Sequence, residues 1–202
     1  YKRQVRTPGP MVWTVTIIGE VPKGTAVMRS GAKVGDVVGV TNYVGYAATG
    51  LGALSYNLVG YDMTKVGHQR PEPQIELGQK LRQLGIHSMN DISDGLGSEL
   101  NEIATASNVS IVFEEQAIPL HEETYELAKH LQTNPVDYAL YGGEDFQLVF
   151  TAPKSLLSEL EKLAGITLIG EVLSGPPRVQ MVTSDKTIKT VEAKGYNHFH
   201  EG

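Results

Sequence analysis

Short runs of apolar and β-branched residues recur along this chain, with the lengths typical of strands. In part they alternate with polar residues, which is typical of strands that bury one face. We therefore predict strands at residues 12–20, 36–41, 86–92, 109–113 and 145–151, and two more between residues 172 and 191 on either side of a turn at 184–186.

Elsewhere the apolar residues recur with a helical period. Leu77, Leu81 and Leu84 lie four and three residues apart, which places them on one face of a helix that Gly85 ends. Residues 60–69 are polar and show no period, so we expect a loop there. The predicted helices cover residues 46–59, 71–84, 95–107, 122–131 and 155–163.

These strands and helices follow one another irregularly, and the last two strands form a hairpin. This order favours an α+β fold, a mixed β-sheet with packed helices, over a doubly wound parallel sheet. We expect residues 1–11 to be an N-terminal tail or the edge of a fragment, because they start without Met and contain the sequence Pro-Gly-Pro. Residues 12–202 then form one α+β domain.

The composition narrows the possible classes of function. The 202 residues carry 17 Lys and Arg against 23 Asp and Glu, and this net charge of −6 argues against a general nucleic-acid binder, which would present a basic face. No apolar run in the sequence approaches the length of a membrane-spanning helix. The lack of cysteine excludes disulfides, thiolate zinc sites and a cysteine nucleophile, and it fits the reducing cytoplasm, where we expect the protein to be located.

Glycine is abundant, at 22 of 202 residues, which raises the question of a phosphate-binding loop. Gly45 and Gly50 have the spacing of a P-loop, but Leu51 and Gly52 stand where that loop needs Lys and then Ser or Thr. The dinucleotide-binding fingerprint also fails, because Ser55 stands where Gly or Ala is required. We expect these glycines to permit close packing of helices against the sheet, with close approach of the backbone to a ligand as the alternative.

Two carboxylates lie three residues apart in the sequence DISDGL at residues 91–96, where a predicted strand meets a predicted helix. Asp94 or Ser93 can serve as a helix cap, but capping does not explain Asp91. Two neighbouring carboxylates repel each other unless a cation lies between them. Mg²⁺ commonly takes one or two carboxylates together with water and substrate phosphates, so metal binding and helix capping both stay open here.

A second acidic segment, Gly142-Gly143-Glu144-Asp145, precedes an apolar strand. A plain turn explains it, and so does contact with a polar group or cation of a ligand. Both interpretations predict that one of the two acids points inward.

Cationic candidates are few. Arg29 lies in a glycine-rich turn, where a guanidinium suits a phosphate oxygen, although a surface arginine is the simpler interpretation. Arg70 is a further candidate for anion binding, but the start of a rigid helix explains it equally well.

Five motifs of this chain resemble, in the same order, those of the thiamine-monophosphate kinases of the aminoimidazole-ribonucleotide-synthetase-like superfamily. The resemblance extends from about residue 12 to residue 199 and concerns the C-terminal domain of that family. The motifs are RSGA at 29–32 with GD at 35–36, RPEP at 70–73, DISDGL at 91–96, GGEDF at 142–146 and GYNHF at 195–199.

The resemblance implies ATP-dependent phosphorylation of thiamine monophosphate to thiamine diphosphate, with Mg²⁺ as cofactor and ATP as co-substrate. It implies direct in-line transfer without a phosphoenzyme, so no side chain is expected as a catalytic nucleophile. An acid and an aromatic face both suit the cationic thiazolium ring. By the resemblance, Asp91 and Asp94 are Mg²⁺ ligands, Arg29 and Ser93 are nucleotide contacts, and Glu144 and Tyr196 are substrate contacts.

The expected partners are thiamine monophosphate and ATP, with neither nucleic acid nor membrane, and the full-length enzyme is expected to be a homodimer. The N-terminal domain of the family, which also binds ATP and Mg²⁺, has no counterpart in this sequence, so we expect little or no kinase activity from the chain alone. The loop after residue 41 departs from the family pattern, because Asn42 stands where glycine is typical, although Asn also tolerates a positive φ.

Two other interpretations stay open. One is another ATP-dependent enzyme of the same superfamily, of the synthetase type. The other is a non-catalytic ligand-binding or oligomerisation domain. The kinase interpretation predicts that Asp91, Asp94 and Glu144 converge in one cleft, whereas carboxylates scattered over separate surfaces would favour the binding domain.

Overall fold

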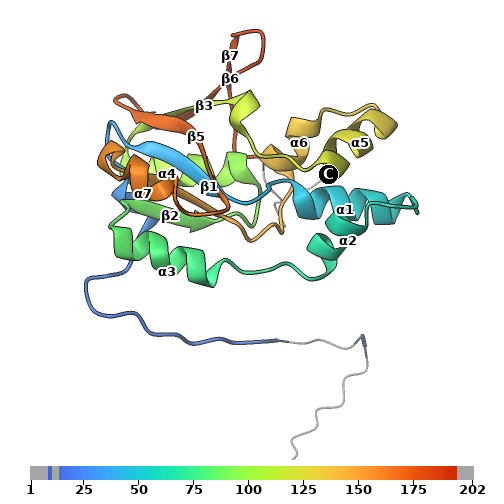
Figure 1. Ribbon diagram of the computed structural model, residues 1–202, viewed down its shortest axis with the longest axis horizontal. Coiled ribbons are helices and arrows are strands. Elements are labelled where there is room, and N and C mark those ends of the chain that lie inside the picture. The colour runs from blue at the N-terminus through green and yellow to red at the C-terminus, as the bar shows by residue number, and fades with distance from the viewer. Residues whose placement is uncertain (1–8, 11–13, 195–202) are drawn as a thin grey trace, which may run out of the picture.

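One seven-stranded sheet forms the centre of the molecule in the computed structural model, which describes residues 9–10 and 14–194 (Figure 1). The strands lie in the order β2-β4-β1-β5-β3-β6-β7. They are β1 (Val37–Thr41), β2 (Ser88–Asp91), β3 (Ser110–Glu114), β4 (Leu148–Ala152), β5 (Ile166–Leu173), β6 (Arg178–Val182) and β7 (Ile188–Thr190). The β3–β6 pair is parallel and the other neighbouring pairs are antiparallel, so the predicted mixed sheet is confirmed.

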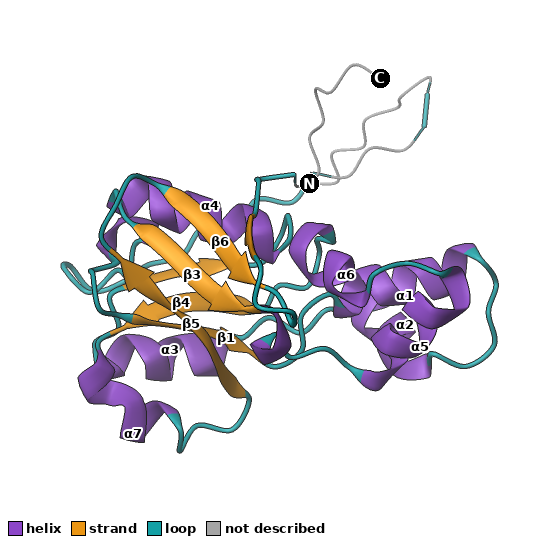
Figure 2. Cartoon of the chain, turned by 90° about the horizontal axis from the view of Figure 1, so that it is seen from above, coloured by secondary structure: helices purple, strands orange, loops and turns teal. Residues whose placement is uncertain are grey.

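The described part of the chain also contains seven α-helices. They are α1 (Tyr46–Ser55), α2 (Asp62–Gln69), α3 (Ile75–Leu84), α4 (Leu96–Ser107), α5 (Glu122–Leu131), α6 (Pro135–Tyr141) and α7 (Leu157–Leu160). Helix α4 lies on one face of the sheet, α3 and α7 lie on the other, and α1, α2, α5 and α6 gather beyond one end (Figure 2). None of the described helices is long and apolar enough to cross a membrane.

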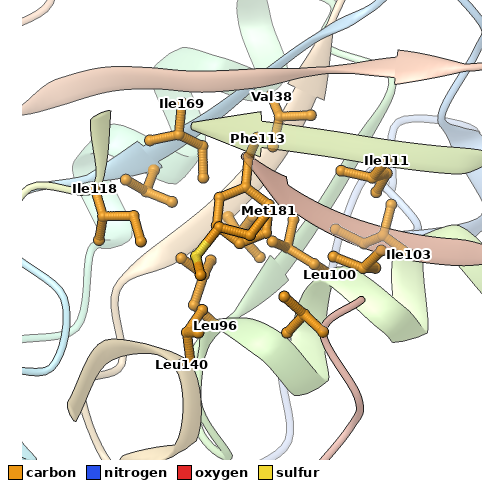
Figure 3. Packing of buried hydrophobic residues seen from close by; sticks show 14 of the residues in the cluster. Val38, Leu96, Leu100, Ile103, Ile111, Phe113, Ile118, Leu140, Ile169 and Met181 are labelled. Atoms are coloured by element: carbon orange, nitrogen blue, oxygen red, sulfur yellow. The ribbon is translucent and has the colours of Figure 1, made fainter. Parts of the chain in front are cut away.

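The sheet separates two apolar clusters, because consecutive residues of a strand point to opposite faces. Val38 of β1 lies in the larger cluster and its neighbour Val37 lies in the smaller one. Phe113 and Leu100 are fully buried where β3 and α4 meet in the larger cluster (Figure 3). Leu81, from the predicted apolar face of α3, is fully buried in the smaller cluster, which confirms that prediction.

The glycines of the helical end serve a different contact from the predicted one. A Cβ atom on Gly50 of α1 would lie 2.0 Å from the backbone oxygen of Thr64 in α2. A Cβ atom on Gly67 of α2 would lie 2.3 Å from the ring of Tyr46 in α1. These glycines therefore allow two helices to approach each other closely, rather than a helix and the sheet.

The strand predicted at residues 12–20 is not present over its described part. Residues 14–20 have no regular secondary structure, and the side chains of Val15, Ile17 and Ile18 are at least 80% exposed. The sequence has the alternation of a strand, but no other described segment pairs with it, and a strand needs a neighbour to complete its hydrogen bonds. Residues 11–13 lie outside the described residues.

The loop predicted at residues 60–69 is also wrong, because most of it is helix α2. Its first turn is stabilised by a residue distant in sequence: the Glu123 carboxylate of α5 accepts hydrogen bonds from the backbone N–H groups of Met63, at 3.3 Å, and Thr64, at 2.8 Å. A cap that comes from another helix leaves no local signal in the sequence.

Three further elements differ from the predictions. Strand β5 and helix α6 were not predicted at all. The helix predicted at residues 155–163 is a 3₁₀ turn, Lys154–Leu156, followed by the single helical turn α7.

Candidate functional site

The loop that carries Asp91 and Asp94 connects the end of β2 to the start of α4. Asp91 is the last residue of β2, and the next residue, Ile92, is fully buried and donates its backbone N–H to the carbonyl oxygen of Gln147 at 2.7 Å. Gly95, with a φ of +98°, then turns the chain into the buried start of α4. Ile92 and Gly95 are buried and fix the loop to the rest of the fold, whereas Asp91 and Asp94 are exposed to solvent.

Neither Asp94 nor Ser93 caps α4, so that part of the sequence analysis is corrected. Gly95 occupies the cap position, and no side chain there makes a capping hydrogen bond. The physical reason is the turn itself, since a Cβ atom at this position would lie 2.6 Å from the carbonyl oxygen of Leu140. Neither aspartate of the loop therefore makes a capping hydrogen bond to the helix.

A third carboxylate, Glu99, lies beneath this loop. It is only 3% exposed, and it accepts hydrogen bonds from the backbone N–H of Asp94 at 3.2 Å and from the side chain of Asn90. Burial, together with the negative charges of Glu102, Asp91 and Asp94, raises the pKa of Glu99 to about 7, although the hydrogen bond from the Asp94 backbone acts in the opposite direction. The sequence analysis missed Glu99, although its place three residues after Leu96, within the apolar face of the helix, is the signal that could have indicated a buried acid.

Arg29 lies beside the same acidic group. It belongs to the 3₁₀ turn η1 (Arg29–Gly31), its guanidinium forms an ion pair with Glu102, and it approaches the side-chain oxygen of Asn90 at 3.4 Å. Half of its side chain remains exposed. Arg29 thus lies beside Asn90, the residue that directly precedes Asp91 in β2.

The Gly142–Phe146 loop is joined to the aspartate loop by its backbone. The N–H of Glu144 donates to the carbonyl oxygen of Ser93 at 2.9 Å, and the N–H of Phe146 donates to that of Ile92 at 2.9 Å. A Cβ atom on Gly143 would lie 2.1 Å from the Ser93 oxygen, so only glycine allows this approach. Asp91, Asp94 and Glu144, all exposed, therefore come from two loops that lie in direct contact.

Of the two acids in the second loop, Asp145 points inward and Glu144 outward, which confirms that one of them would be buried. Asp145 is 5% exposed and accepts hydrogen bonds from the backbone N–H groups of Gly45, at 2.6 Å, and Ala47, at 2.8 Å, at the start of α1. Burial raises its pKa to about 7, although these hydrogen bonds act in the opposite direction. Glu144 and Phe146 on either side adopt positive φ values of 67° and 49°, a backbone conformation that is uncommon outside glycine.

A cavity of about 550 Å³ borders this site between α3 and the ends of β2 and β4, and Asp91 and Phe146 are part of its lining. Within the described residues, no group of three or more His, Asp or Glu side chains is arranged to hold a metal ion. Two exposed carboxylates nevertheless fit Mg²⁺, which commonly takes one or two of them and completes its coordination with water and substrate phosphates. Tyr196, the second predicted substrate contact, lies outside the described residues.

Asn42, where the sequence departs from the family pattern, has the positive φ that was predicted as possible there, +45°. Its side chain donates to the side-chain oxygen of Gln147 at 3.0 Å, which ties the β1–α1 turn to the start of β4.

Known proteins resemble this chain in sequence and in structure. The family described as AIR synthase related protein, C-terminal domain, matches residues 33–182. The thiamine-monophosphate kinase of Bacillus subtilis (strain 168) is 39% identical over 206 residues, a match that covers 96% of this chain and 62% of that protein. The chain therefore spans about three fifths of the length of the curated relatives it matches.

Two solved structures have the same fold over most of the chain. The thiamine-monophosphate kinase from Stenotrophomonas maltophilia K279a superimposes with a TM-score of 0.74 at 30% identity, over 80% of this chain and 54% of that one. The structure of AaThiL complexed with AMPPCP and TMP also gives a TM-score of 0.74, at 34% identity, over 86% of this chain and 54% of that one.

Proposed function

This chain belongs to the family described as AIR synthase related protein, C-terminal domain, and we propose that it takes part in the ATP-dependent phosphorylation of thiamine monophosphate to thiamine diphosphate. The γ-phosphoryl group of ATP passes to a phosphate oxygen of thiamine monophosphate, and ADP leaves. The sequence identity to proteins named thiamine-monophosphate kinase supports the proposal.

One observation carries the proposal: the hydrogen-bonded contact between the aspartate loop and the Gly142–Phe146 loop. It connects the two loops that carry the exposed carboxylates of Asp91, Asp94 and Glu144, which supports their convergence, and Asp91 lines the cavity beside these loops. A non-catalytic binding module would not need this convergence, so the second alternative of the sequence analysis is less favoured.

In this proposal Asp91 and Asp94 hold Mg²⁺. When bound, Mg²⁺ neutralises the charge that develops on the transferring phosphoryl group. Asp91 and Asp94 would hold the ion through their carboxylate oxygens, and Ser93 and Arg29 would contact the nucleotide beside them. Arg29 keeps this role only if its guanidinium binds Glu102 and a phosphate oxygen at once, which its five N–H donors and half-exposed side chain permit.

The substrate is contacted by Glu144 and Tyr196 in the same proposal. The Glu144 carboxylate faces solvent, where it attracts the positive charge of the thiazolium ring. Tyr196 offers its ring face to the same cation. Phosphoryl transfer needs positioning and charge neutralisation more than covalent chemistry from the protein, so no side chain acts as a nucleophile.

The proposal extends to the whole enzyme. Residues 12–202 form the C-terminal α+β domain. The part of the enzyme that corresponds to the uncovered part of the relatives provides the remaining contacts to ATP and Mg²⁺. The complete enzyme is a cytoplasmic homodimer that acts on small molecules, not on nucleic acid or membrane. The chain alone then shows little or no turnover.

The experiment that tests this function is an assay of product formation by the enzyme that contains this chain. We expect thiamine diphosphate and ADP to form in equal amounts from thiamine monophosphate and Mg·ATP, as measured by chromatography. A synthetase of the same superfamily would release ADP or phosphate without forming thiamine diphosphate, and that result would favour the rival interpretation. Robust turnover by the 202-residue chain alone would refute the assignment of part of the site to another domain.

A further inference from the structure

A second cavity, of about 440 Å³, lies where the chain leaves α3 and enters β2, and the function described so far does not use it. Its walls come from residues 24–27, from Arg82 and Gln83 near the end of α3, and from Ile86 and His87 before β2. Its volume is in the range of small-molecule sites. The described residues that line it include no Asp or Glu, although the chain carries a net charge of −6. Any charge on these side chains therefore comes from Arg82 and His87.

Arg82 is a basic residue of this lining whose donors are not used within the protein. The residue is half-buried, and in the described part of the chain its guanidinium makes no hydrogen bond or ion pair. A guanidinium carries five N–H donors in a planar fork that matches two oxygens of a phosphate or a carboxylate. An anion in the cavity would give these donors their acceptors.

His87 belongs to the same lining, and a buried acid holds its ring in place. Its Nδ1 atom lies 2.9 Å from both carboxylate oxygens of Asp36, which is only 2% exposed. One of these oxygens also accepts hydrogen bonds from the backbone N–H of Lys33, at 2.9 Å, and from the hydroxyl group of Thr151, at 3.2 Å. Because Asp36 occupies Nδ1, Nε2 is the ring nitrogen that remains for a ligand.

A third basic group, the side chain of Lys33, lies beside this ring. Its Nζ atom is 3.3 Å from Nε2 of His87. The ammonium can donate to this nitrogen only while the ring is unprotonated, since a protonated imidazole has no acceptor. An anion between the two groups would let both of them donate, and opposite charges would then replace a contact between two basic groups. Lys33 is exposed, so its side chain can move onto a ligand.

The position of the cavity at the C-terminal end of α3 acts against an anion, because the helix dipole places partial negative charge there. The carbonyl oxygens of Arg82 and Leu81 are, however, already bonded by the backbone N–H groups of Gly85, at 3.1 Å, and Ile86, at 3.5 Å. The dipole of a helix also contributes less than one hydrogen bond to a charged group. Three basic side chains therefore outweigh it.

We propose that the cavity bounded by Arg82 and His87, with Lys33 beside it, is a binding site for a phosphate group, either inorganic phosphate or a phosphate monoester. The oxygens of one phosphate can accept from a guanidinium, an imidazole and an ammonium at once. The cavity adjoins the one that Asp91 lines, since Arg82 borders both, but Asp91 does not line it. The inference does not rest on the proposed function, because no residue of the acidic loops takes part.

The test uses the enzyme that contains this chain, with Mg·AMPPCP and thiamine monophosphate at high concentration so that the site of the proposed function is filled. NMR of the ¹⁵N-labelled histidines follows the Nε2 signal of His87 during a titration with sodium phosphate at constant pH. We expect a saturable shift of this signal, and no comparable shift with sodium chloride at the same ionic strength. The exposed His130 on α5 is the reference, and its signal should stay in place.

Calorimetric titration with phosphate under the same conditions measures the contribution of each basic group. We expect Arg82→Gln and Lys33→Gln each to weaken phosphate binding by about fivefold or more, since each variant loses a charged contact. Arg178→Gln on β6 and Lys129→Gln on α5 alter exposed side chains that do not line the cavity, and we expect phosphate affinity to stay within about twofold of wild type. Thermal unfolding of each variant confirms that the fold is intact.

Titration with glycerol 3-phosphate distinguishes the two sources of the phosphate group. Binding of inorganic phosphate alone would assign the site to the free ion, and equal or tighter binding of glycerol 3-phosphate would assign it to a monoester; both results support the inference. An unchanged His87 signal would overturn it, and so would a shift that sodium chloride reproduces. Normal phosphate affinity in both folded variants, Arg82→Gln and Lys33→Gln, would place the ion elsewhere and overturn the inference as well.

Discussion

Glu99 is a buried acid next to the acidic loops, and the sequence analysis did not identify it. Its carboxylate lies beneath Asp91 and Asp94, and burial raises its pKa to about 7 from the ordinary value of 4.5. The folded protein therefore binds a proton at Glu99 more tightly than the unfolded chain does. Its contribution to stability is complete below pH 4.5 and is lost as the pH rises towards 7.

Replacing this carboxylate with a neutral amide removes that dependence on pH. We expect the free energy of unfolding of wild type, relative to Glu99→Gln, to fall by up to about 3 kcal/mol between pH 4.5 and a pH above 7. Urea unfolding at a series of pH values, without divalent cations, measures the difference. A difference that stays constant with pH would show that Glu99 titrates normally. The exposed Glu126→Gln on α5 serves as the control and is expected to show no such trend.

Between elements, the buried Asp145 connects the Gly142–Phe146 loop to the start of α1. Both of its carboxylate oxygens accept backbone N–H groups, those of Gly45 and Ala47. An asparagine at this position turns one donor towards another donor, so Asp145→Asn loses at least one of these hydrogen bonds.

We therefore expect faster hydrogen exchange at the backbone amides of Gly45 or Ala47 in Asp145→Asn, by about tenfold or more, with a loss of stability of about 1–3 kcal/mol. Hydrogen exchange followed by NMR measures the first effect, and urea unfolding the second. Asp137→Asn, an exposed change in the first turn of α6, is the matched control. Unchanged exchange at both amides would show that Asp145 does not hold α1 to the loop.

The contact between α1 and α2 depends on Gly50. Glycine to alanine usually stabilises a helix interior by about 1 kcal/mol, but here the added Cβ atom would meet the backbone oxygen of Thr64 at 2.0 Å. We expect Gly50→Ala to destabilise the protein by about 2–3 kcal/mol. Gly78→Ala on α3 is the comparison, because its Cβ atom would meet only the ends of two side chains, Leu148 at 3.3 Å and Met89 at 3.8 Å. Urea unfolding that ranks Gly50→Ala as the more stable variant would contradict this packing.

Predictions for elements succeeded where the signal was local and failed where the partner was distant. The apolar face of α3 and the turn at Gly85, which has a φ of +85°, are encoded in neighbouring residues. Helix α2 is not, because the carboxylate that caps it belongs to Glu123 of α5. The alternating residues 14–20 were predicted as a strand, but a strand also needs a neighbour, which the sequence of the segment does not specify.

For the whole molecule, the irregular order of strands and helices was sufficient to predict a mixed sheet and an α+β fold. The sequence also indicated the two acidic segments, but not that they touch. Their contact depends on the pairing of β2 with β4, which places Asp91 opposite Leu148, two residues beyond Phe146. The second cavity and the buried Glu99 arise from packing between separate elements, so they became visible only in the folded structure.

The central claim is that Asp91 and Asp94 act together to hold the metal and phosphates for transfer to thiamine monophosphate. The most direct measurement is the rate of thiamine diphosphate formation in the enzyme that contains this chain, compared between wild type, Asp91→Asn and Asp94→Asn. We expect each variant to lose about a hundredfold or more in kcat, because the charge on the transferring group is no longer neutralised. Affinity for thiamine monophosphate and the unfolding midpoint should stay near those of wild type. Turnover that is unchanged in both folded variants would contradict the account.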